Sequence, residues 1–238
     1  MSDPCSPDFR PLPFRAASWV LYDFANTIYM AAVTYLLASH MAASPAGGSA
    51  LGVTTTLAMI LAGVGTPLFA SLADYTGRAG AYCTVTTLLC ILSMAGFGLF
   101  TDSPAMLVAC LFTSTVFYQA ALVFYNSLLP SVARTENRGL VSGLGVGLGY
   151  LGNLFTLLIA FPVKAKWGLS AAFFVATAGF LLLAMPCMIL VRDLRALNLQ
   201  PFSWRLARGQ GVEVLDSIRA LPSRPRLMWF LLANFFAV

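Results

Sequence analysis

Long apolar stretches alternate with short polar segments along the chain of 238 residues. Six of the apolar stretches contain at most one charged side chain, and each has the length of about 20 residues that a helix needs to cross a bilayer. They lie at 16–39, 50–73, 79–101, 105–133, 139–163 and 167–191. The pattern predicts an all-α membrane protein, with a six-helix transmembrane bundle over 16–191.

Three further segments flank the predicted bundle. Residues 1–15 form a short N-terminal segment, and residues 192–226 form a long polar loop that we expect in the cytoplasm. A last apolar run, 227–238, would measure only about 18 Å as a helix, at about 1.5 Å per residue. We expect this run to be the truncated start of a seventh transmembrane helix.

Composition and charge agree with the hydrophobic pattern. The chain is 59% hydrophobic and 10% charged, whereas soluble domains are about 25% charged. Twelve of its 14 basic residues, all arginines, fall on one side of the predicted membrane, and Lys164 and Lys166 fall on the other. Basic loops mark the cytoplasmic side, so we expect an integral multi-pass protein with a cytoplasmic N-terminus, in the plasma (inner) membrane if bacterial. The net charge of +5 then reflects topology, and nucleic-acid binding is not expected.

No metal or cofactor is predicted. The five cysteines and the single histidine, His40, do not form a metal-ligand spacing. Buried thiols that pack as small hydrophobic groups are the simpler interpretation.

Asp23 is the one charged residue within the six apolar runs. A carboxylate inside a bilayer costs about 2.5–3.5 kcal/mol on insertion scales, so such a residue usually faces a bundle interior or a wet cavity. Asn26 and Thr27 follow at helical spacing on the same face. We expect Asp23 to face a hydrated central cavity and to be the candidate proton or cation coupling site. An ion pair with Arg15, about two turns earlier, is the alternative.

Polar residues also recur along the fourth apolar run. Thr115, Gln119 and Asn126 lie on one helical face, and we expect Asn126 to lie at the same depth as Asn26. Interhelical hydrogen bonds that serve only packing are the alternative. The predicted substrate or ion pathway consists of Asp23, Asn26, Tyr29, Gln119, Tyr125 and Asn126.

Glycines are closely spaced at the start of the fifth apolar run. Gly147, Gly149 and Gly152 fit the G-x-G-x-x-G dinucleotide fingerprint, but that motif needs a preceding strand, so we exclude it. Small residues at intervals of four allow close contact between membrane helices. The predicted packing residues are Gly139, Gly143, Gly145, Gly147, Gly149 and Gly152.

The turn after the second apolar run contains LADYTGR, residues 72–78. Asp74 can accept hydrogen bonds at a helix terminus, Gly77 permits a tight turn, and Arg78 marks the cytoplasmic side. The segment resembles the loop between helices 2 and 3 of the major facilitator superfamily, G-x-L-A-D-R-x-G-R-[KR]. Three positions depart from that pattern: Ala70, Tyr75 and Ala79. The resemblance implies that Asp74, Gly77 and Arg78 belong to a cytoplasmic gate.

Three further stretches resemble the vacuole effluxer-like branch of this superfamily, whose autophagy-related fungal members export amino acids from the vacuole. They are WVLYDFANTIY at 19–29, YNSLLP at 125–130 and RGLVSGLGVGLGYLGN at 138–153. The resemblance covers all six predicted helices. It implies half of a twelve-helix fold, with a C-terminal half of the same carrier expected as a partner.

The expected function is secondary active transport of a small polar solute by alternating access, with proton or cation coupling. The six helices are expected to form two inverted three-helix repeats around a site at the bilayer midplane. Amino acids are the substrate class that the resemblance implies. A non-transporting scaffold or interaction protein is the alternative. A membrane-embedded enzyme is less favoured, because it would need a nucleophile with a base or a metal cluster, and we find neither in the sequence.

Overall fold

The computed structural model describes residues 13–44, 46–191, 223, 225 and 228. Within this part of the chain, six helical segments are long and apolar enough to cross a membrane. The predicted all-α membrane bundle is therefore confirmed. The predictions for the first twelve residues, for nearly all of the 192–226 loop and for the seventh helix fall outside the described residues.

The six spans are built from continuous and interrupted helices. The first span comprises α1 (Pro13–Ala31), the π-helical segment η1 (Ala32–Leu37) and α2 (Ala38–Met41). The next three are α3 (Gly47–Thr76), α4 (Ala79–Leu99) and α5 (Pro104–Ser127), and the short helix α6 (Leu129–Val132) follows. The fifth span comprises the 3-10 turn η2 (Thr135–Asn137), α7 (Arg138–Phe155), the π-helical segment η3 (Thr156–Ala160) and α8 (Phe161–Trp167), and the sixth is α9 (Leu169–Leu190).

The fourth apolar run does not form one helix, although its apolar pattern continues to residue 133. Helix α5 ends at Ser127, and α6 begins at Leu129 with Pro130 in its first turn. A proline has no backbone N–H to donate, so it fits the first turn of a helix far better than the interior. The chain therefore starts a new helix at this point.

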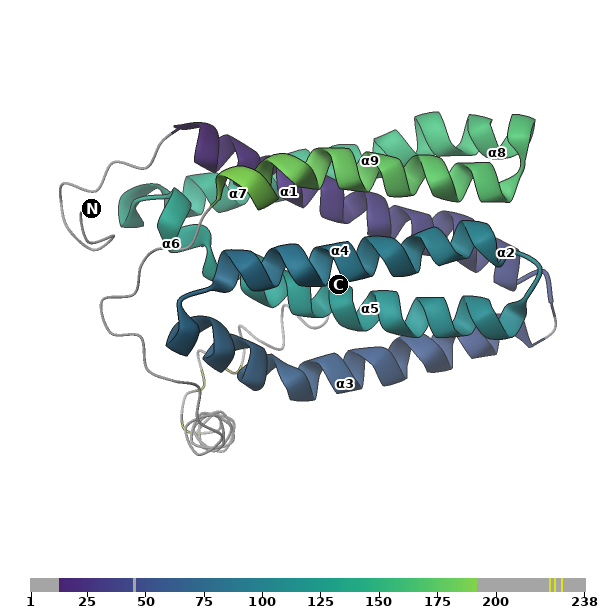
Figure 1. Ribbon diagram of the computed structural model, residues 1–238, viewed down its shortest axis with the longest axis horizontal. Helices are drawn as coiled ribbons and strands as arrows, with labels where there is room; N and C mark the ends of the chain where they lie inside the picture. The colour runs from purple at the N-terminus through teal and green to yellow at the C-terminus, as the bar shows by residue number, and fades with distance from the viewer. Residues whose placement is uncertain (1–12, 45, 192–222, 224, 226–227, 229–238) are drawn as a thin grey trace.

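The spans pack in two layers along the long axis of the molecule (Figure 1). In one layer α1 contacts both α7 and α9, and in the other α5 contacts both α3 and α4. The layers meet where α4 packs against α9 and where the side chains of α1 reach α5.

The helix pairs follow the symmetry of two three-helix repeats. The first span contacts the fifth, and the second contacts the fourth. The first span also contacts the sixth, and the third contacts the fourth. Exchanging spans 1, 2 and 3 with spans 4, 5 and 6 converts each pair into its counterpart. Equivalent spans are three crossings apart and therefore run in opposite directions, so the repeats are inverted.

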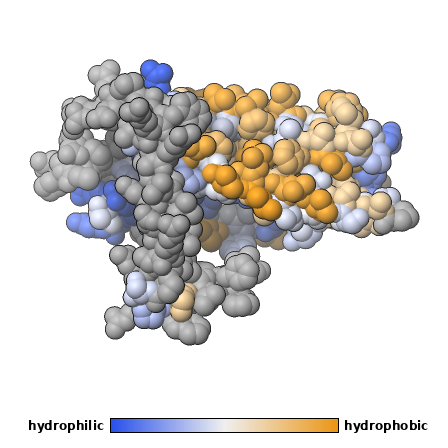
Figure 2. Space-filling model, turned by 90° about the horizontal axis from the view of Figure 1, so that it is seen from below, coloured by the Kyte–Doolittle hydropathy of each residue, from blue (hydrophilic) through white to orange (hydrophobic). Residues whose placement is uncertain are grey.

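Between its ends, the face of the bundle that the grey residues leave visible in Figure 2 is largely apolar. On α3, for example, Val53, Ile60 and Val64 are 60%, 58% and 73% exposed. Soluble monomers rarely expose continuous apolar patches larger than a few hundred Å². A surface of this kind is suited to the hydrocarbon of a bilayer or to another helix.

Candidate functional site

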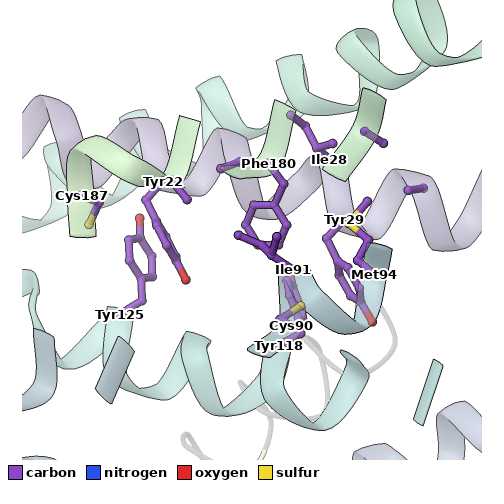
Figure 3. Packing of buried hydrophobic residues seen from close by; sticks show 14 of the residues in the cluster. Tyr22, Ile28, Tyr29, Cys90, Ile91, Met94, Tyr118, Tyr125, Phe180 and Cys187 are labelled. Carbon is purple, nitrogen blue, oxygen red and sulfur yellow. The ribbon is translucent and has the colours of Figure 1, made fainter. Parts of the chain in front are cut away.

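Trp19 and Tyr125 join the first and fourth spans through two reciprocal hydrogen bonds. The indole Nε1 of Trp19 donates to the Tyr125 carbonyl at 3.1 Å, and the Tyr125 hydroxyl donates to the Trp19 carbonyl at 3.0 Å. Their rings are stacked with centroids 4.3 Å apart. Tyr22 also stacks on Tyr125, with centroids 4.7 Å apart (Figure 3). These contacts fix how α1 and α5 lie against each other along their length.

Tyr29 makes a second aromatic contact between the same two helices. Its ring stacks on Tyr118 with centroids 4.6 Å apart. Its hydroxyl lies 3.0 Å from Ser114 Oγ and 3.2 Å from Thr115 Oγ1. The buried hydroxyl groups at this level are thus hydrogen-bonded, as groups removed from water usually are.

Asn26 lies on α1 between these two aromatic contacts. Its side chain is buried, with 3% of its surface exposed, and neither amide atom has a hydrogen-bond partner among the described residues. A buried polar group without a partner costs about 1–3 kcal/mol. Asn26 therefore offers unused hydrogen-bonding capacity within the bundle.

Asp23 is partly buried and lies against α7. A Cβ atom placed on Gly145 would be 3.1 Å from Asp23 Oδ2, so the carboxylate lies beside the glycine-rich face of that helix. One turn further along α1, the Thr27 hydroxyl donates to the Gly149 carbonyl. Within the described ranges, the Asp23 carboxylate has no hydrogen bond or ion pair, and the Nε of Arg15 is buried without a partner. The alternative ion pair with Arg15 is therefore not formed in this structure.

The glycines of α7 divide into two sets. Cβ atoms on Gly145, Gly149 and Gly152 would meet atoms of α1, and at Gly152 the distance to the Phe24 carbonyl oxygen would be only 2.5 Å. Cβ atoms on the second set would meet no atom within 4 Å among the described residues, and this set comprises Gly139, Gly143 and Gly147. The structure thus brings one set into the α1–α7 contact and leaves the other facing away from it.

The remaining predicted pathway residues differ in exposure. Tyr29 and Tyr125 are each 2% exposed and lie in the contact between α1 and α5. Gln119 is partly buried, and Asn126 is exposed. In this conformation the polar residues predicted to line one cavity are therefore distributed between the helix contact and the surface of α5.

The prediction that Asn26 and Asn126 lie at the same depth is wrong. The Trp19–Tyr125 and Tyr29–Tyr118 contacts set the alignment of the antiparallel helices α1 and α5. Asn126 therefore lies near the level of Trp19, about two turns from Asn26. The prediction failed because it took the fourth helix to continue to residue 133, whereas α5 ends one residue after Asn126.

The predicted gate loop joins α3 to α4. Gly77 adopts the left-handed conformation, with φ of 60°, and its N–H donates to the Ala73 carbonyl at 2.9 Å. Asp74 and Arg78 are both exposed. A cavity of about 170 Å³ lies between this loop and the α5–α6 junction, where Ser127 and Ser131 contribute to its lining.

Replacing Gly77 by alanine is expected to destabilise the protein by about 1–2 kcal/mol, because a side chain disfavours the left-handed conformation by that amount. Thermal unfolding of the purified protein measures the effect. Gly52→Ala on α3 is the matched control, since a Cβ there would meet no atom within 4 Å. Equal effects of the two substitutions would contradict the importance of the backbone conformation at Gly77.

Sequence reasoning missed Trp19 and Tyr22 as site residues. Both are buried, and both carry the contact with Tyr125. The signal was present in the spacing of Trp19, Tyr22, Asn26 and Tyr29, which places all four on one helical face. The predicted pathway was instead centred on Asp23, which lies on the neighbouring face of α1 that meets α7.

Comparison with known proteins indicates a transporter family. The chain is 27% identical over 93% of its length to an MFS-type transporter of Bacillus subtilis (strain 168), named YxiO and uncharacterized, and spans 56% of that protein. It is 31% identical over 51% of its length to an uncharacterized protein of Aquifex aeolicus (strain VF5), and spans 31% of that protein. No family model matches the chain. The Bacillus similarity, which extends over 93% of the chain, supports membership in the major facilitator superfamily (MFS).

Proposed function

We propose that the protein is a secondary active transporter of the major facilitator superfamily, which moves a small polar solute across the membrane by alternating access. The observation that carries this proposal is the similarity to the MFS-type Bacillus protein over 93% of the chain. The inverted pairing of six apolar spans supports it, because many secondary transporters are built from inverted repeats around a site at the midplane. Amino acids are the proposed solute class, from the resemblance of the YDFAN and glycine-rich segments to the vacuole effluxer-like branch.

Asp23 is the proposed proton or cation coupling site. Three features favour this role: the carboxylate lies inside an apolar span, it is partly exposed, and it has no ion pair among the described residues. Intramembrane carboxylates of this kind usually belong to ion pathways. The other proposed pathway residues are Asn26, Tyr29, Gln119, Tyr125 and Asn126.

The proposed orientation places the start of α1 in the cytoplasm. The α3–α4 loop, the segment between α5 and α7 and the first residue of α7 lie at that same end of the bundle, and they contribute Arg78, Arg134 and Arg138. Basic residues concentrate on the cytoplasmic side of membrane proteins. Asp74, Gly77 and Arg78 then form part of a cytoplasmic gate.

The proposed partner of this bundle is a C-terminal half of the same carrier. The chain spans 56% of the length of the Bacillus relative. Several glycines on α3 and α7 face no described atom within 4 Å, namely Gly48, Gly52, Gly63, Gly139, Gly143 and Gly147. Surfaces of this kind allow another helix to approach closely.

Asp23→Asn is expected to slow solute uptake driven by a pH gradient by about tenfold, since coupling between two sites typically changes affinities by 5- to 150-fold. The measurement is uptake of a panel of amino acids by proteoliposomes that contain the full-length protein, with and without a pH gradient. Exchange of labelled for unlabelled solute at equal pH should continue, because it needs no net movement of protons.

Glu136→Gln is the matched control, because it also removes one carboxylate but lies on the exposed turn η2. It should leave both uptake and exchange unchanged. Unaltered gradient-driven uptake by Asp23→Asn would remove this residue from the coupling step. Failure of the unmodified protein to transport any solute in the panel would instead favour a scaffold.

A further inference from the structure

A second cavity, of about 640 Å³, opens at the end of the bundle opposite the gate loop. It lies between the end of the first span, the start of α3 and the turn from α4 to α5. Sites for small molecules usually have volumes of about 300–1,000 Å³. The residues around Asp23 and the α1–α7 contact do not line this cavity.

The wall of the cavity is anchored in the core of the protein. Met41 and Leu107 line it and are only 5% and 2% exposed, and Ala50 and Val108 also pack against the core. The wall is therefore apolar and held in place by its own packing.

Two hydrogen bonds tie the rim together. His40 Nε2 lies 3.0 Å from the Thr101 carbonyl, and the Thr101 hydroxyl lies 3.3 Å from the Ser170 hydroxyl on α9. These contacts join the first span to the α4–α5 turn, and that turn to the sixth span. A carbonyl oxygen only accepts, so His40 Nε2 donates this hydrogen bond.

The charge at the rim is negative. Asp102 is the one acidic side chain among the described residues that line the cavity. It is exposed, and no ion pair to it is found in the described ranges. The Asp102 carboxylate therefore presents hydrogen-bond acceptors beside an apolar wall.

We propose that this cavity binds a small organic monocation with an apolar body, of the kind represented by a protonated arylalkylamine. The apolar wall covers the hydrocarbon part, and the Asp102 carboxylate faces the ammonium group. A metal ion fits less well, because the described residues contain no cluster of three or more His, Cys, Asp or Glu side chains. This inference goes beyond the proposed transport and does not depend on it.

The test is equilibrium binding of labelled phenethylammonium to the full chain in lipid nanodiscs, with binding to empty nanodiscs subtracted. Saturable binding is expected. Asp102→Asn should weaken it by about fivefold, the effect typical of one partly solvated charge pair. The neutral 2-phenylethanol should compete about fivefold less well than unlabelled phenethylammonium, and 3-phenylpropionate should compete least.

Two further variants separate the cavity from general effects of charge and folding. Ala50→Leu should weaken binding by narrowing the cavity, while circular dichroism and size-exclusion chromatography verify that this variant is folded. Glu136→Gln removes a carboxylate at the other end of the bundle and should leave binding unchanged. Absence of saturable binding, equal affinity in Asp102→Asn, or stronger competition by the anion would each overturn the proposal. Because binding is measured without transport, failure here leaves the transport proposal untouched.

Discussion

Replacing Trp19 by alanine is expected to destabilise the protein by about 3–5 kcal/mol, the range found when a buried tryptophan or phenylalanine is truncated to alanine. Trp19 is 2% exposed. The substitution removes the ring stacked on Tyr125 and the hydrogen bond from the indole to the Tyr125 carbonyl. The first and fourth spans would then lose their closest aromatic contact.

Two comparison variants divide this effect into its parts. Trp19→Phe keeps a smaller aromatic ring and removes the indole hydrogen bond, so a loss of at least about 1 kcal/mol is expected. The Tyr125 carbonyl still accepts the Leu128 N–H in that variant. Trp167→Ala is the control, because Trp167 is 62% exposed on α8, and its effect should stay below about 1 kcal/mol.

Unfolding of the purified full chain in detergent, followed by circular dichroism during titration with sodium dodecyl sulfate, measures these differences. Trp19→Ala and Trp167→Ala with equal effects would contradict the central role of the Trp19–Tyr125 contact. A loss in Trp19→Phe as large as that in Trp19→Ala would contradict a stabilising role for the stacked ring that phenylalanine keeps.

Gly152→Ala is the second large expected effect, a destabilisation of about 1–3 kcal/mol from overpacking. The added Cβ would lie 2.5 Å from both the Phe24 carbonyl oxygen and Thr27 Oγ1. A backbone oxygen cannot rotate away, so α1 and α7 would have to separate. The hydrogen bond from Thr27 to the Gly149 carbonyl would lengthen as they do.

Gly147→Ala on the same helix is the matched control. Its Cβ would meet no described atom within 4 Å, and alanine is about 1 kcal/mol better than glycine within a helix. The two variants should therefore shift the unfolding midpoint in opposite directions. Destabilisation by Gly147→Ala of the same size as that by Gly152→Ala would mean that a surface outside the described residues covers Gly147 equally closely.

The hydrophobic pattern predicted the existence and approximate position of each of the six spans that the structure describes. A backbone that crosses hydrocarbon must satisfy its own hydrogen bonds, so a long apolar run has few alternatives to a helix. The ends of the spans were less predictable. The second apolar run was expected at 50–73, but α3 covers Gly47–Thr76, since a helix continues into the polar boundary where water can still satisfy its ends.

Contacts between spans were not readable from the apolar pattern. On α7, the regular spacing of Gly139, Gly143 and Gly147 suggested packing as strongly as that of Gly145 and Gly149. Of these two sets, the one with Gly145 and Gly149 lies in the α1–α7 contact and the other does not, because the rotation of α7 about its axis depends on which face of α1 it meets. In a bilayer, lipid and protein interiors are similarly apolar, so hydrophobicity alone does not select one face.

The sequence by itself determined that the chain is a helical membrane protein, where its six spans lie and that a lone carboxylate sits in the first of them. The tertiary structure decided what surrounds that carboxylate, which of two glycine sets meets α1, and that Trp19 and Tyr125 join the first and fourth spans. The physical reason is how far apart in the sequence the interacting residues lie. Burial of apolar residues and backbone hydrogen bonding act along each segment. Stacking, close glycine contacts and the alignment of antiparallel helices instead depend on residues that lie more than 100 positions apart. Those residues meet only when the described spans are packed together.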